Sequence, residues 1–186
     1  PTFAEYATAL ETVDCRVERH FLREENDFAV TDAILDAVHP GIDMVLLCQP
    51  NNPTGQLARP ALVEALLHKC EAVGAVLAVD ECFLDFLPEG QSLSAKRLLS
   101  TSKSLVILKA FTKLYGMAGV RLGYALSADA ELLARMRAAG QPWAVSSLAQ
   151  AAGIAALDET DYVAQVRALI ETQRPALAGG LRALGL

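Results

Sequence analysis

Residues 43–55 read DMVLLCQPNNPTG, an apolar run followed directly by a stretch rich in proline and asparagine. An apolar run without polar alternation is typical of a strand that is buried on both faces. The proline, asparagine and glycine residues that follow are typical of a turn, and they fit neither a helix nor a strand. We therefore expect a buried strand over 43–48 whose carboxyl end opens into a polar loop.

Similar apolar runs recur along the chain. They predict further buried strands over 74–79 and 104–108, and another strand over 120–125. Apolar and polar residues alternate over 15–21, which predicts a half-buried strand there. Helical patterns separate these runs and are expected near residues 31–38, 60–72, 94–99, 128–139, 147–156 and 160–178.

Two prolines bear on the expected helices. Pro60 suits the first turn of the helix over 60–72, whereas Pro175 predicts a kink or break in the last helix. The alternation of buried strands with helices predicts an α/β fold in which a mostly parallel sheet is sandwiched by helices.

Composition excludes several classes of protein. The 186 residues fit one domain, and 53% hydrophobic residues exclude a disordered chain. The net charge of -6 argues against a general basic face for nucleic acid or anionic membranes. The four cysteines lack the spacing of a metal site or disulfide framework, so we expect reduced thiols in a cytoplasmic protein and no metal. The apolar runs are shorter than the roughly 18 residues of a membrane span, and no secretory leader opens the sequence.

Polar residues follow the expected buried strands. Asn52, Asp80 and Lys113 come after three of the apolar runs, and Arg121 stands at the start of the next expected strand. Ligands of parallel sheets gather outside the carboxyl ends of the strands. Each residue alone has an ordinary explanation: a turn, a loop cap, a surface amine, or an ion pair between Arg121 and Asp80. Together, the four predict a binding site.

Three segments carry a resemblance to a known family. Residues 110–124, AFTKLYGMAGVRLGY, resemble the lysine signature of fold-type I pyridoxal-phosphate enzymes, as do NNPTG at 51–55 and DECF at 80–83. They occur in the order found in that family. The resemblance implies pyridoxal 5'-phosphate as the cofactor and a fold like the large domain of these transferases. It also implies that residues 1–186 form that domain incompletely, without the N-terminal arm and the C-terminal small domain.

The resemblance implies a role for each site residue. Lys113 is the catalytic residue that binds the cofactor aldehyde covalently, for which a buried, electropositive lysine is expected. Asp80 faces the ring nitrogen and keeps it protonated. Asn52 donates to the phenolic oxygen, and Arg121 binds the phosphate through its planar fork. Phe3 matches the aromatic position that stacks on the ring face.

Two positions depart from the family pattern. Many relatives carry a tyrosine where this chain has Phe83, so a hydrogen bond to the phenolic oxygen is lost. Relatives also often carry a serine or threonine phosphate ligand where this chain has Ala110. We expect Thr112 to compensate in part as a cofactor-binding residue.

Segments 3–6, 31–35, 80–86 and 136–143 resemble the threonine-phosphate decarboxylases of cobalamin synthesis, which are themselves similar to histidinol-phosphate aminotransferases. The resemblance implies decarboxylation of L-threonine O-3-phosphate, a small phosphorylated amino acid, to (R)-1-amino-2-propanol O-2-phosphate, and a homodimer. A histidinol-phosphate-type aminotransferase and a non-catalytic scaffold stay open as alternatives. For the isolated chain, we expect weak cofactor binding and little turnover.

Overall fold

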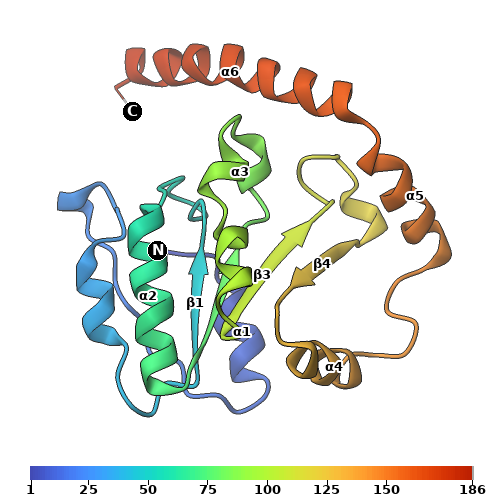
Figure 1. Cartoon of the computed structure of the whole chain (residues 1–186). Helices are drawn as coiled ribbons and strands as arrows, with labels where there is room; N and C mark the ends of the chain where they lie inside the picture. The colour runs from blue at the N-terminus through green and yellow to red at the C-terminus, as the bar shows by residue number, and fades with distance from the viewer. Residues whose placement is uncertain (186) are drawn as a thin grey trace.

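The computed structural model describes residues 1–185, which contain one four-stranded sheet with the strand order β1-β2-β3-β4 (Figure 1). The strands are β1 (Met44–Cys48), β2 (Val76–Asp80), β3 (Leu105–Ala110) and β4 (Gly123–Leu126). The first three run parallel, which confirms the mostly parallel α/β sheet, whereas β4 runs antiparallel to β3. No helix crosses the sheet between β3 and β4, and a parallel pair needs such a crossover connection.

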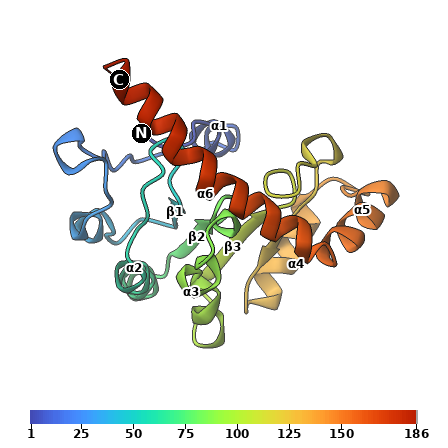
Figure 2. The same cartoon turned by 90° about the horizontal axis from the view of Figure 1, so that it is seen from above.

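Helix α2 (Pro60–Val73) supplies most of the helical packing against the sheet. It begins at Pro60 after an extended residue and ends at Gly74, which adopts the left-handed conformation with φ 75°. Its buried residues recur three to four positions apart and are Leu62, Val63, Leu66, Leu67 and Cys70. Helix α2 lies on one side of the strands and α1 (Glu5–Glu11) on the other (Figures 1 and 2). The expected helix over 60–72 is therefore confirmed.

The remaining helices are short, except for those near the C-terminus. They are η1 (Glu24–Asn26), η2 (Asp32–Ala37), η3 (Leu84–Phe86), α3 (Gly90–Leu93), η4 (Ala95–Ser100), η5 (Ala118–Val120), α4 (Ala130–Ala139), α5 (Ser147–Leu157) and α6 (Thr160–Ala183). Helix α6 passes over the end of the sheet at which β1 and β3 finish (Figures 1 and 2). None of the helices within residues 1–185 is long and apolar enough to cross a membrane.

Of the kink or break expected at Pro175, the break is absent, because α6 continues through Pro175 to Ala183. A proline inside a helix removes one backbone hydrogen bond and frees the carbonyl four residues earlier. Helix α6 has no buried residues, so water can hydrate that carbonyl.

The expected strand over 15–21 is also wrong. This segment is irregular and mostly exposed, and no described strand pairs with it. Its charged side chains instead interact locally, since Arg16 pairs with Glu18 and His39 contacts the same carboxylate. Alternation predicts a strand only where a neighbouring strand can complete the ladder.

Candidate active site

Asp80 occupies the middle of the sheet edge at which the parallel strands end. The register places Cys48 opposite Asp80 and Asp80 opposite Leu108. The loop after β1, which contains Asn52, and the loop after β3, which contains Lys113, therefore leave the sheet on either side of Asp80. This is the arrangement that the polar residues after the apolar runs predict.

Both carboxylate oxygens of Asp80 accept hydrogen bonds. The backbone N–H of Cys82 donates to Oδ1 at 2.9 Å, and the Tyr6 hydroxyl donates to Oδ2 at 2.6 Å. Burial, reinforced by the hydrogen bond to Asp80, raises the pKa of Tyr6 above its ordinary value. The phenol therefore stays protonated and remains a donor near neutral pH.

Lys113 lies over an aromatic ring. Its Nζ is 5.3 Å from the centre of the Phe83 ring, a cation–π distance, and Phe83 is three residues beyond Asp80. Within residues 1–185, the Lys113 ammonium has no ion-pair partner. The expectation of a buried lysine is wrong, because the Lys113 residue is exposed on the loop after β3. Phe83 thus lacks the hydroxyl of the tyrosine that many relatives carry at this position, but its ring contacts Lys113.

Arg121 returns to the same region at the other end of this loop. A hydrogen bond of 3.1 Å from the backbone N–H of Phe111 to the carbonyl of Leu122 closes the loop, so Arg121 comes back towards Thr112. The Arg121 guanidinium donates to the carbonyl of Ala118 at 3.1 Å and is exposed. No carboxylate of the described residues lies within ion-pair distance of it, so the alternative of an Arg121–Asp80 pair is wrong. The guanidinium is accessible to an anion.

The two asparagines of the NNPTG turn have different surroundings. The Asn51 side chain is buried, donates to Pro1 O and Thr54 Oγ1, and accepts from the Thr2 hydroxyl. Asn52 is half-buried, and no hydrogen bond of its side chain is found among residues 1–185. Asn51 therefore holds the turn to the N-terminal residues, whereas the Asn52 amide makes no such contact within the described chain.

The N-terminal segment brings an aromatic pair to this side of the molecule. Phe3 is 43% exposed and meets the ring of Tyr6 edge-on, with 5.3 Å between ring centres. The sequence assigns a role to Phe3 but misses Tyr6, although the three-residue spacing places both on one face of a helical turn. Only the tertiary contact with Asp80 distinguishes Tyr6 from other tyrosines.

Glu81, the residue next to Asp80, belongs to a buried network of charged side chains. Glu81 is fully buried and accepts from the Ser94 hydroxyl, the Ala95 N–H and Lys109 Nζ at 2.7, 2.7 and 3.2 Å. Lys109 Nζ also lies 2.8 Å from Asp85. Burial opposes the charged amine, but the hydrogen bond to Asp85 and the two carboxylate charges raise the pKa of Lys109 overall. Neighbouring strand residues face opposite sides, so this network fixes the end of β2 from the side away from Asp80.

A cavity of about 590 Å³ lies between β3, β4 and α6, and its lining includes Asp85, Lys109, Tyr124 and Arg167. None of Asn52, Asp80, Lys113 and Arg121 lines it. The candidate site is thus an open edge of the sheet, separate from this cavity.

The side chains at the edge fit one particular group. Pyridoxal phosphate needs an amine for its aldehyde, a guanidinium for its phosphate and a carboxylate for its ring nitrogen. Lys113 and Arg121 are exposed cations without carboxylate partners in the described chain, and Asp80 is a half-buried carboxylate. The donor set of this edge matches the chemistry of that cofactor.

Comparison with known proteins agrees with this chemistry. The family model for aminotransferase class I and II matches residues 1–186. Threonine-phosphate decarboxylase of Salmonella typhimurium is 39% identical over 162 residues, which are 87% of this chain and 44% of that protein. Histidinol-phosphate aminotransferase of Lactiplantibacillus plantarum is 34% identical over 178 residues, which are 94% of this chain and 48% of that protein. The chain spans about half the length of the curated relatives it matches.

Solved structures give a similar result. The histidinol-phosphate aminotransferase from Clostridium acetobutylicum superposes with a TM-score of 0.90 at 26% identity, covering 98% of this chain and 54% of that chain. The L-threonine-O-3-phosphate decarboxylase from Porphyromonas gingivalis superposes with a TM-score of 0.76 at 27% identity, covering 94% of this chain and 49% of that chain. Among these proteins, sequence identity is higher for a decarboxylase, whereas structural similarity is higher for an aminotransferase.

Proposed function

Because the chain belongs to the aminotransferase class I and II family, whose members use pyridoxal 5'-phosphate, we propose that it forms the cofactor-binding domain of a threonine-phosphate decarboxylase. The substrate is L-threonine O-3-phosphate and the product is (R)-1-amino-2-propanol O-2-phosphate. The 39% identity to the Salmonella typhimurium decarboxylase supports this choice. The observation that carries the site is the position of Lys113. Its ammonium lies above the ring of Phe83, which is near Asp80, and it has no ion-pair partner among the described residues.

Each polar residue has one task in this proposal. Pyridoxal phosphate supplies, when bound, an aldehyde that an amine can capture and a ring that accepts electrons. Lys113 Nζ makes the covalent attachment, and Arg121 binds phosphate oxygens through its guanidinium fork. Asn52 donates to the phenolic oxygen, and Asp80 accepts from the ring nitrogen.

Two further residues assist. Phe3 offers a partly exposed ring for stacking, and Thr112 offers a hydroxyl for the phosphate. When not bonded to the cofactor, the Lys113 amine would be able to hold or move a proton. In the decarboxylation, Lys113 Nζ would donate the proton that takes the place of the lost CO2 at the substrate Cα.

A histidinol-phosphate-type aminotransferase is the second candidate, supported by the TM-score of 0.90 to the Clostridium acetobutylicum enzyme. The two reactions differ in which bond of the substrate is broken, and groups that orient the substrate decide this. An assay of the full-length protein separates them. Release of CO2 from L-threonine O-3-phosphate supports the decarboxylase, whereas amine exchange that depends on a keto acid supports the aminotransferase.

The cofactor site itself is tested by absorbance. Purified protein mixed with pyridoxal phosphate is expected to develop a band near the visible edge, weakly in the isolated chain, from the covalent adduct at Lys113. Lys113→Arg is the informative variant, because it keeps a cation over Phe83 but cannot form the adduct. Lys103→Ala is the matched control at a lysine outside the site and should keep the band. If the wild-type protein developed no band, only the alternative of a non-catalytic scaffold would remain.

A further inference from the structure

Tyr6 makes a hydrogen bond to which the proposed chemistry assigns no role. Its hydroxyl donates to Asp80 Oδ2 at 2.6 Å, although the two residues are 74 positions apart in the sequence. Tyr6 lies in the first turn of α1, and this helix has no buried residues. The hydrogen bond is thus a specific link between a helix without buried residues and the central carboxylate of the site.

The link fixes the orientation of Asp80. With Cys82 N–H on Oδ1 and Tyr6 on Oδ2, both oxygens are held, so rotation of the carboxylate would break a hydrogen bond. An ionised carboxylate has about four acceptor positions, so about two remain for another donor. Asp80 can therefore accept from a ligand without losing either contact.

Tyr6 also connects Asp80 to the exposed aromatic ring of the site. The Phe3 and Tyr6 rings pack edge-on at an interplanar angle of 80°. The residues before Phe3 are held in turn, because Asn51 binds both Pro1 and Thr2. One short N-terminal segment thus carries the candidate stacking ring and the hydroxyl that holds Asp80.

We infer that Tyr6 is a positioning residue of the proposed cofactor site, which holds the Asp80 carboxylate in the orientation that accepts a hydrogen bond from a protonated ring nitrogen. This inference rests on the proposed function. Tyr6 acts through Asp80 and needs no contact with the cofactor. Burial and the hydrogen bond to Asp80 raise the pKa of Tyr6, so it donates throughout the neutral range.

The variant Tyr6→Phe tests this role in the full-length protein, because it removes the hydroxyl and keeps the ring against Phe3. We expect the dissociation constant for pyridoxal phosphate, measured from the absorbance band, to rise about tenfold, the lower end of what one hydrogen bond to a charged group contributes. With ¹⁵N-labelled cofactor, the ring-nitrogen resonance should move towards its unprotonated position. Tyr162→Phe is the matched control, since no hydrogen bond of its hydroxyl is found within the described chain.

Asp80→Asn separates positioning from a merely structural role. In that background, Tyr6→Phe should cause no further loss of affinity, because its effect runs through the Asp80 carboxylate. An equal loss in both backgrounds, or a Tyr6→Phe protein with wild-type affinity and an unchanged ¹⁵N resonance, would overturn the inference. A wild-type protein that forms no band would instead overturn the proposed function.

Discussion

Residues 30–107 and residues 112–185 differ in how far their apolar side chains are buried. All members of the main hydrophobic cluster lie between Val30 and Ile107. In the second region, α4 and α6 have no buried residues, and α5 buries only alanine and glycine. Both regions have the apolar periodicity of helices, so periodicity predicts a helix in each, but burial also needs a facing surface.

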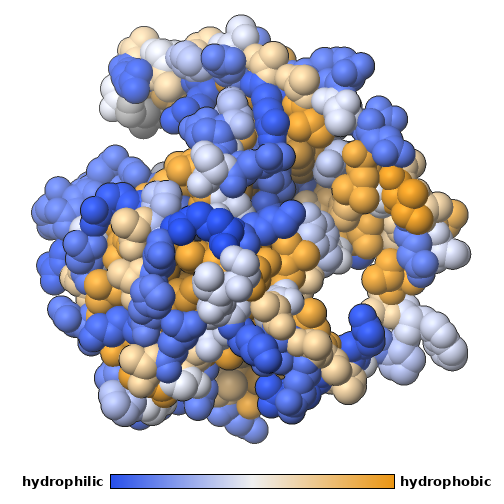
Figure 3. Space-filling model, in the orientation of Figure 1, coloured by the Kyte–Doolittle hydropathy of each residue, from blue (hydrophilic) through white to orange (hydrophobic). Residues whose placement is uncertain are grey.

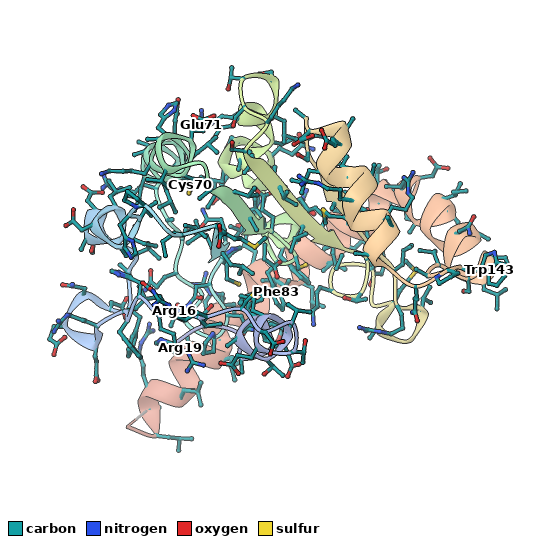
Figure 4. The ribbon with its side chains drawn as sticks, turned by 90° about the horizontal axis from the view of Figure 1, so that it is seen from below. Arg16, Arg19, Cys70, Glu71, Phe83 and Trp143 are labelled. Carbon is teal, nitrogen blue, oxygen red and sulfur yellow. The ribbon has the colours of Figure 1, made fainter. Side chains whose placement is uncertain are left out.

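The second region exposes apolar side chains instead. Leu148, Ile154 and Leu177 are 82%, 70% and 67% exposed, and apolar surface is visible around α5 in Figure 3. Trp143 is 96% exposed and projects from the edge of the molecule (Figure 4). Asn52 and Asp80 belong to the packed region, and the Lys113 loop begins where it ends. The candidate site thus rests on the part of the chain that has a core.

The largest expected effect is at the buried ion network that joins Lys109 to Glu81 of the packed region. Lys109→Met leaves the carboxylate of Glu81, which is 0% exposed, without its cation. We expect the free energy of unfolding to fall by about 3–5 kcal/mol in urea titrations. The control Arg97→Ala breaks the exposed Arg97–Glu64 pair and should cost about 0–1 kcal/mol. Equal effects of the two variants would contradict this difference.

A second test compares leucines on two helices. Leu66 on α2 is 0% exposed, so Leu66→Ala should lower the free energy of unfolding by about 2–5 kcal/mol. Leu177 on α6 is 67% exposed, so Leu177→Ala should change it by less than about 0.5 kcal/mol. The helix propensity change is the same in both variants. Equal destabilisation by Leu177→Ala and Leu66→Ala would contradict the difference in packing between the two regions.

The smallest expected effect is a dependence of stability on acid. The Ser102 hydroxyl donates to Glu71, and this hydrogen bond, followed by the contact with His68, lowers the pKa of Glu71 from its ordinary value. A lowered folded-state pKa adds stability above the unfolded value, and that stability is lost as the pH falls through the folded value. Glu71 is about one-third exposed, so we expect less than about 1 kcal/mol.

Urea titrations between pH 7 and pH 3 measure this contribution. Ser102→Ala should flatten the acid dependence, whereas Ser100→Ala, which removes a hydroxyl that donates to the Arg97 carbonyl, should leave it unchanged. A Ser102→Ala protein with the wild-type pH profile would show that this hydrogen bond contributes nothing.

Local patterns in the sequence are enough to predict most of the packed region. The runs that form β1, β2 and β3 are apolar throughout, and α2 has Pro60 at its start and Gly74 at its end. The antiparallel direction of β4 is not encoded in its own residues, because it depends on the connection from β3. The segment over 15–21 alternates as a strand would, but nothing in its sequence says that no strand lies beside it.

The candidate site shows the same limit. The positions of Asn52 and Asp80 after buried strands predict that they share an edge of the sheet. The exposure of Lys113 and its contact with Phe83 depend on how two loops meet. The Tyr6–Asp80 hydrogen bond spans 74 residues and could be found only in the folded chain.

The most direct test of the central claim is to find which lysine binds the cofactor. Protein incubated with pyridoxal phosphate is reduced with borohydride, which makes the adduct permanent, and its peptides are mapped by mass spectrometry. We expect modification at Lys113 in preference to the other four lysines, Lys69, Lys96, Lys103 and Lys109. Label spread evenly over the exposed lysines, or absent from Lys113, would contradict it.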